Sequence, residues 1–121
     1  MAAIVKAVEE QVEEKLEDGS RRVRLHKPIR AFDKTMSEVT FREPTAKDVI
    51  EIGNPVEIGT DRHGKATIEF DKDIGTQMMA RLANIPVASI VNQMSVSDWL
   101  NCKWAIANFF VPTGEPEATS T

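Results

Sequence analysis

The chain has 121 residues, of which 41% are hydrophobic and 28% charged, a composition typical of one globular domain. Its net charge of -4 gives no general reason to expect a nucleic-acid partner, and its single cysteine excludes an internal disulfide. No apolar run approaches the ~20 residues that span a bilayer, and no signal peptide is visible, so we expect a cytoplasmic protein with no membrane contact.

Residues 1–20 predict an acidic amphipathic helix ahead of the main domain. A narrow aliphatic stripe recurs every four positions from Ile4 to Leu16, glutamates fill the other faces, and the pattern ends at Asp18. Three interpretations stay open for this helix. It could dock on the core, pair with the same helix of another copy, or fray when alone.

Residues 21–111 predict the main domain, which begins with a β-hairpin. Residues 22–26 and 37–43 alternate polar and apolar side chains, so we expect two antiparallel strands joined through residues 30–35. The segment 21–47 carries eight basic and three acidic residues, which is typical of a solvated hairpin face. The alternative is a small regulatory or nucleic-acid-binding protein that uses this basic segment.

A short helix follows the hairpin. Pro44 ends the second strand, Thr45 and Asp48 predict a capping box, and Gly53 ends the helix. Apolar residues then alternate on both sides of a turn-rich stretch. The segment 54–70 is therefore either a second hairpin or a long loop.

Beyond Asp71 the apolar period changes from two to about 3.6, which predicts a layer of helices. Asp71 caps the first of these helices, which is weakened by Gly75 and ends at Asn84. Residues 87–94 predict a further helical segment.

The last helix begins at the predicted cap Ser95, with Asp98 as the partner in a capping box. It is apolar over most of its circumference, which predicts burial on several sides or against a partner. We therefore expect the chain to form a homo-oligomer. Residues 112–121 contain Pro, Gly, Glu, Ser and Thr, and we expect them to be disordered.

The sequence predicts no catalytic, metal or cofactor site. The two histidines, His26 and His63, belong to different predicted hairpins, and one cysteine offers no metal-ligand spacing. Cys102 lies on an apolar stripe of the last helix, where a buried and unreactive thiol is expected. We therefore expect that the protein is not an enzyme.

Large flexible and aromatic side chains on adjacent predicted helices form the candidate partner-binding set. Methionines adapt to irregular partners and aromatic residues anchor interfaces, although both types also fill protein cores. Both interpretations stay open for this set. Its members are Met78, Met79, Trp99, Trp104 and Phe109.

Short motifs spread over residues 23–110 follow one another in a recognisable order. They are Leu-His-Lys-Pro-Ile at 25–29, Val-Thr-Phe-Arg-Glu-Pro-Thr at 39–45 with Asp48, Met-Ala-Arg-Leu-Ala-Asn-Ile-Pro at 79–86, Ser-Asp-Trp at 97–99 and Ala-Asn-Phe-Phe at 107–110.

This order of motifs resembles the small tail assembly chaperones of contractile-tailed phages, the P2-like and Mu-like family. The resemblance implies a protein that acts in the host bacterial cytoplasm, binds the tape measure protein, keeps it soluble during tail assembly and is absent from the mature virion. It also implies a longer form, made by ribosomal frameshifting near the end of the gene, that reaches the tail tube protein.

The leading interpretation is therefore a tail assembly chaperone. We expect an α+β fold with an N-terminal helix, a small antiparallel hairpin sheet and a C-terminal helical layer.

Overall fold

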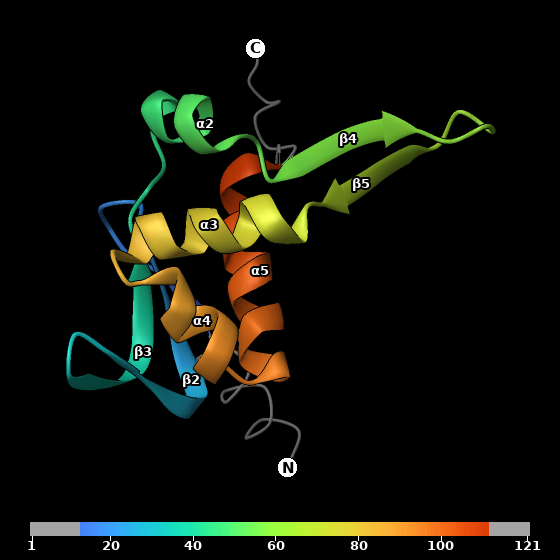
Figure 1. The fold of residues 1–121 in the computed structure, drawn as a ribbon. Coiled ribbons are helices and arrows are strands. Elements are labelled where there is room, and N and C mark those ends of the chain that lie inside the picture. The colour runs from blue at the N-terminus through green and yellow to red at the C-terminus, as the bar shows by residue number, and fades with distance from the viewer. Residues whose placement is uncertain (1–12, 112–121) are drawn as a thin grey trace.

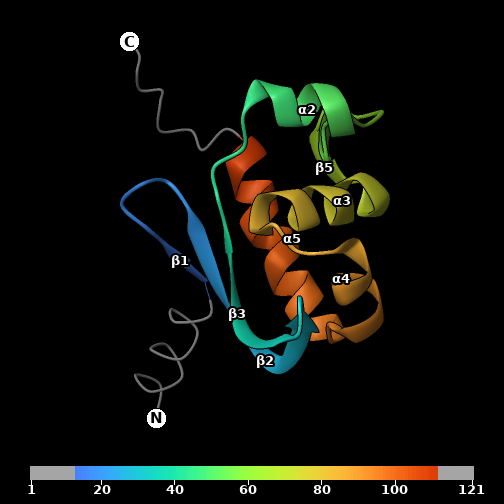
Figure 2. The ribbon, with the colours of Figure 1, turned by 60° about the vertical axis from the view of Figure 1, so that its left-hand side comes forward.

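The computed structural model describes residues 13–111, which form an α+β fold. A sheet of strand order β1-β2-β3 lies on one side of the molecule, and α3, α4 and α5 pack against β2 and β3 (Figures 1 and 2). The elements are β1 (Glu13–Lys15), β2 (Arg21–Ala31), β3 (Lys34–Phe41), α2 (Ala46–Ile52), β4 (Val56–Thr60), β5 (Ala66–Phe70), α3 (Lys72–Ala83), α4 (Val87–Gln93) and α5 (Val96–Phe110).

The predicted N-terminal helix is wrong, because the described chain begins with a strand. β1 pairs antiparallel with the start of β2, with Glu13 opposite Val23 (Figure 2). Ion pairs hold it at the sheet edge: Glu13 lies 2.7 Å from Arg21, and Glu14 pairs with Arg22. Residues 1–12, which carry most of the predicted helix, lie outside the described residues. The predicted fold class is correct only as α+β, since a sheet precedes the helices.

β2 and β3 form the predicted first hairpin, with longer strands and a tighter turn than expected. Phe32 and Asp33 both have positive φ, 56° and 64°, so two residues make the connection. Two positive φ values characterise the type I′ turn, whose twist matches that of a hairpin. Pro28 lies inside β2 where the register shifts between Arg24 and Ile29, and its missing amide hydrogen therefore breaks no ladder bond.

Side chains from α4 and α5 bind the edge of β2 beyond the reach of β1. Asp98 accepts hydrogen bonds from the backbone amides of His26 at 2.8 Å and Lys27 at 3.0 Å. Gln93 accepts from the amide of Arg30 at 2.8 Å and donates to its carbonyl at 3.1 Å. The amides of His26 and Lys27 are partly buried and need partners, so their bonds to Asp98 fix α5 against the strand, and the exposed Gln93 bonds add a second link from α4.

The short helix α2 is attached through the buried carboxylate of Asp48. Arg42 donates to both of its oxygens, at 2.8 and 3.0 Å, and Arg81 of α3 donates at 3.3 Å. The Thr45 amide donates at 2.8 Å, so Asp48 also closes the predicted cap of α2. Hydrogen bonding from the Arg42 guanidinium lowers the pKa of Asp48 far below its ordinary value of 3.8.

The core lies between the sheet and the helices. The predicted caps of α3 and α5 are confirmed: Asp71 accepts from two amides of the first turn, and Ser95 accepts from the Asp98 amide at 3.2 Å. The Asp98 carboxylate binds β2 instead of completing a capping box with Ser95.

Within residues 13–111, no helix combines the length and apolar character needed to cross a membrane. The largest fully buried side chains include Phe41, Ile29, Met78, Met79, Ile106, Val23 and Val39.

The segment 54–70 forms a hairpin rather than a loop, and this hairpin projects beyond the helices (Figure 1). Its base is anchored by Phe70, which lies opposite Val56 in the pairing register. Gly75 of α3 leaves the space that Phe70 occupies, since a Cβ atom at Gly75 would lie 2.2 Å from the ring. The glycine that weakens the predicted helix therefore sets the position of the hairpin.

Replacing Asp48 with Asn should lower the free energy of unfolding by about 2 kcal/mol at neutral pH, because it removes the charged acceptor of two arginines. The folded-state pKa is depressed, so the stabilisation by Asp48 is fully present above pH 3.8 and is lost as the pH falls below that value. Urea unfolding at several pH values measures both effects. An Asp48→Asn protein whose stability falls as steeply in acid as the wild type would contradict this assignment.

Replacing Gly75 with Ala should destabilise the protein, although Ala favours helices by up to about 1 kcal/mol over Gly. The added methyl group overlaps the Phe70 ring, and overpacking of this kind costs roughly 1–3 kcal/mol. Thermal unfolding measures the difference. The matched test is the double variant with Phe70→Leu, in which the smaller side chain should make Gly75→Ala far less harmful; equal harm in both backgrounds would refute the explanation.

Candidate partner-binding surface

The structure separates the five predicted partner-binding residues by depth. Met78 and Met79 on α3 are fully buried and belong to the core between the sheet and the helices. Neither side chain reaches the surface of the described protein. Their contribution is to support the helices that carry more exposed residues.

Trp99 is half-buried and joins α5 to α3 and to the hairpin. Its indole nitrogen donates to the Thr76 hydroxyl oxygen at 3.1 Å, and that hydroxyl donates to the Lys72 carbonyl at 2.7 Å. The Phe70 ring meets the Trp99 ring edge-on, with centroids 6.1 Å apart. Such T-shaped pairs are favourable beyond their buried area, so Trp99 holds the hairpin base in place.

Phe109, near the end of α5, is half-buried beneath a cation from the sheet. The Arg21 guanidinium lies 5.4 Å from the centroid of its ring and is itself paired with Glu13 at 2.7 Å. This arrangement covers one face of the ring with a charged group of the same chain. Phe109 is therefore less open to a partner than an exposed aromatic residue would be.

Trp104 is the member of the set that faces water, with 58% of its surface exposed. Val96, Leu100 and Trp104 follow one another at four-residue spacing on α5, which places them on one side of the helix. All three are exposed, while Cys102 and Ile106 face the core. An exposed apolar line thus runs along about two turns of α5.

A second exposed apolar face lies on the hairpin, and the candidate set from the sequence does not include it. Ile58 and Ile68 are directly opposite each other and are 54% and 57% exposed. Because side chains two apart on a strand share a face, this pair continues the face that Phe70 begins at the base. The signal in the sequence was the apolar alternation on both sides of the turn.

Lys103 joins the two apolar faces. Its ammonium nitrogen lies 5.7 Å from the centroid of the Phe70 ring and 5.3 Å from that of Trp104. The aromatic residues of the hairpin and of α5 therefore flank one cation. We call this region the corner surface, defined by Ile58, Ile68, Phe70, Leu100, Lys103 and Trp104.

A smaller apolar depression lies at the other end of α5, next to α4. Its volume is about 260 Å³, and exposed Val91 and Val96 lie on its rim. Val87, one turn earlier on α4, is also exposed. The remaining lining residues are Thr76, Ile90, Met94, Ser95 and Trp99.

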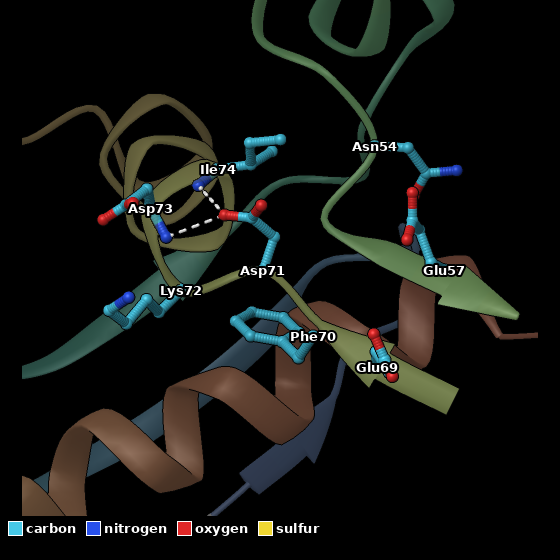
Figure 3. Close-up of a pocket in the computed structure, with 8 residues that line it drawn as sticks. All are labelled: Asn54, Glu57, Glu69, Phe70, Asp71, Lys72, Asp73 and Ile74. Carbon is cyan, nitrogen blue, oxygen red and sulfur yellow. Dashed lines mark hydrogen bonds between the residues drawn. The ribbon is translucent and has the colours of Figure 1, made fainter. Parts of the chain in front are cut away.

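The acidic hollow at the base of the hairpin does not have the character of a metal site. Glu57 and Glu69 lie opposite each other on the strands, and Asp71 and Asp73 follow at the start of α3 (Figure 3). One Asp71 oxygen accepts from the amides of Asp73 and Ile74, both at 2.9 Å, so this carboxylate serves as a helix cap. Within residues 13–111, no group of three potential ligands has a metal-binding arrangement.

The one thiol is also unsuited to nucleophilic chemistry. Cys102 is fully buried in α5, and burial raises its pKa to about 12. A thiol with this pKa stays protonated at neutral pH and is a poor nucleophile. The predicted burial of this cysteine is confirmed.

Three arginines of the basic segment 21–47 form ion pairs with acidic residues of the same chain. Arg21 pairs with Glu13, Arg22 pairs with Glu14, and Arg42 binds the buried Asp48. These ion pairs neutralise three of the eight basic residues of the segment.

Comparison with known proteins places the chain in a family. The family model described as "Phage tail assembly chaperone proteins, E, or 41 or 14" matches residues 22–111, from the start of β2 to the end of α5. Neither a search of curated proteins nor a search of solved structures finds a match. The match covers well over half of the 121 residues and includes the whole corner surface. It confirms the resemblance inferred from the sequence motifs, and the chain belongs to the phage tail assembly chaperone family.

Proposed function

We propose that this protein binds the tape measure protein of its phage through the corner surface and keeps it soluble in the host cytoplasm until the tail tube forms around it. The observation that carries the proposal is an exposed apolar surface on a chain of this family. The surface combines an aromatic anchor, Trp104, with two aliphatic side chains on a projecting hairpin. An amphipathic helix of the client would place its apolar stripe between the two parts of this surface, the β4–β5 hairpin and α5.

The proposal assigns different roles to the five residues expected from the sequence. Trp104 contacts the client directly. Trp99 holds the hairpin against α5, and Phe109 lies at the far end of that helix beneath Arg21. Met78 and Met79 support the surface from the core.

The proposal also includes a second partner and a place of action. A longer form made by frameshifting near the end of the gene would connect the complex to the tail tube protein. The chaperone would leave before the virion is complete.

Replacing Trp104 with Asp should reduce binding of the tape measure protein by roughly tenfold or more while the domain stays folded, because a charge then enters an apolar contact. Ile68→Asp tests the hairpin arm in the same way. The measurement is the soluble fraction of the tape measure protein after co-expression, with circular dichroism as the check of folding.

The matched control is Phe32→Asp. Phe32 is an aromatic side chain of similar exposure, 67%, in the β2–β3 turn, and Asp tolerates its positive φ. This control should leave client solubility unchanged. If Trp104→Asp and Ile68→Asp fold and also leave it unchanged, the client binds elsewhere.

Self-association, expected from the apolar last helix, forms a separate part of the proposal. We assign it to the exposed valines beside the depression between α4 and α5, where Val91 is 63% exposed. Light scattering across a dilution series at micromolar concentration should show a mass above that of one chain, and Val91→Asp should reduce it. A strict monomer at high concentration would contradict this assignment.

A further inference from the structure

Lys103 is the one charged member of the corner surface and lies at its centre. Its ammonium rests between the rings of Phe70 and Trp104. The ion pairs within residues 13–111 involve arginines and do not include Lys103. The cation is held in place by aromatic faces and has no carboxylate partner in the described protein.

A partner that covers this surface changes the surroundings of the ammonium. In the free protein, Lys103 is partly exposed and therefore accessible to water, and the aromatic rings contribute a modest cation–π attraction. Once an apolar stripe excludes that water, an unpaired ammonium becomes costly. A partner with an acceptor opposite Lys103 avoids this cost, and a carboxylate is the strongest acceptor that a protein offers.

The two strand glutamates beside the isoleucine pair point away from the corner surface. Glu57 and Glu69 lie one residue away from the Ile58–Ile68 pair along each strand, so they belong to the opposite face of the hairpin. Of the six residues that define the corner surface, Lys103 is the one that carries a charge, and the other five are apolar. A complementary partner carries the reverse pattern.

We propose that the corner surface selects an amphipathic helix whose apolar stripe is interrupted by an Asp or Glu that pairs with Lys103. This inference rests on the proposed function and adds to it the chemistry of the client segment. Selection works chiefly by rejecting other helices. A fully apolar stripe would bury the Lys103 ammonium without a partner, and a basic stripe would repel it. Lys103 is thus a specificity-determining residue.

Overlapping helical peptides of about 20 residues, which span the tape measure protein, test the inference. Each peptide carries a fluorescent label, and its binding to the full chain is followed by fluorescence polarisation. Bound segments should carry an acidic residue within the apolar stripe. Changing that residue to Gln should weaken binding by about tenfold, and Lys103→Glu should weaken binding of the acidic peptide further.

The decisive variant is the exchanged pair. A peptide with Lys at the acidic position should bind Lys103→Glu better than it binds the wild type, which isolates the coupling between the two sites. Lys47→Glu, the same charge change on α2, controls for the altered net charge and should leave the peptide preference unchanged. Restored binding in the exchanged pair is not expected from a role of Lys103 in folding alone.

The outcomes separate this inference from the proposed function. If wild type and Lys103→Glu bind the same segments with equal affinity while co-expression keeps the client soluble, the inference is wrong and the function stands. If no segment binds although the client stays soluble, the inference is also wrong. If Trp104→Asp converts a dimer into a monomer, the corner surface is an interface between copies, and the inference is overturned. Failure of co-expression itself would remove the proposed function.

Discussion

The two hydrogen bonds from the backbone of β2 to the carboxylate of Asp98 determine how the rest of the molecule is arranged. They join a side chain in the first turn of α5 to adjacent amides at the irregular part of a strand. Since a helix turns about 100° per residue, fixing Asp98 against the sheet also fixes the rotation of the whole helix. Cys102 and Ile106 then face the core, and Leu100 and Trp104 face water. The position of the candidate surface follows from this rotation.

The hairpin arm depends on a second constraint, the close fit between two elements. Phe70 occupies the space left by the missing side chain of Gly75, and its ring also meets Trp99. A two-stranded hairpin is marginal by itself in water. Contacts at its base therefore hold the projecting part in a defined direction (Figure 1), and Ile58 and Ile68 on this hairpin are more than half exposed.

Local signals in the sequence predicted the helices and their caps, because Asp71 and Ser95 act on amides within one turn of themselves. The strand at residues 13–15 was missed because its pairing with β2 is not a local property, and a four-residue aliphatic period that begins outside the described residues predicted a helix through this segment. The candidate site was predicted in part. The residue types were correct for an interface, but whether Trp104 is exposed depends on the rotation of α5. The spacing of apolar residues on this almost wholly apolar helix does not determine that rotation. The exposed apolar face of the β4–β5 hairpin could be identified only from the structure, because its exposure depends on how the hairpin packs against the helices.

The buried thiol described above makes this chain convenient for chemical labelling. Cys102 is the sole cysteine, it has no exposed surface, and burial raises its pKa to about 12, so maleimides react with it slowly while the protein is folded. A cysteine introduced at the hairpin tip, for example in place of the exposed Lys65, supplies a selectively reactive thiol without removal of the native one. A dye at that position would report on the surroundings of the hairpin tip.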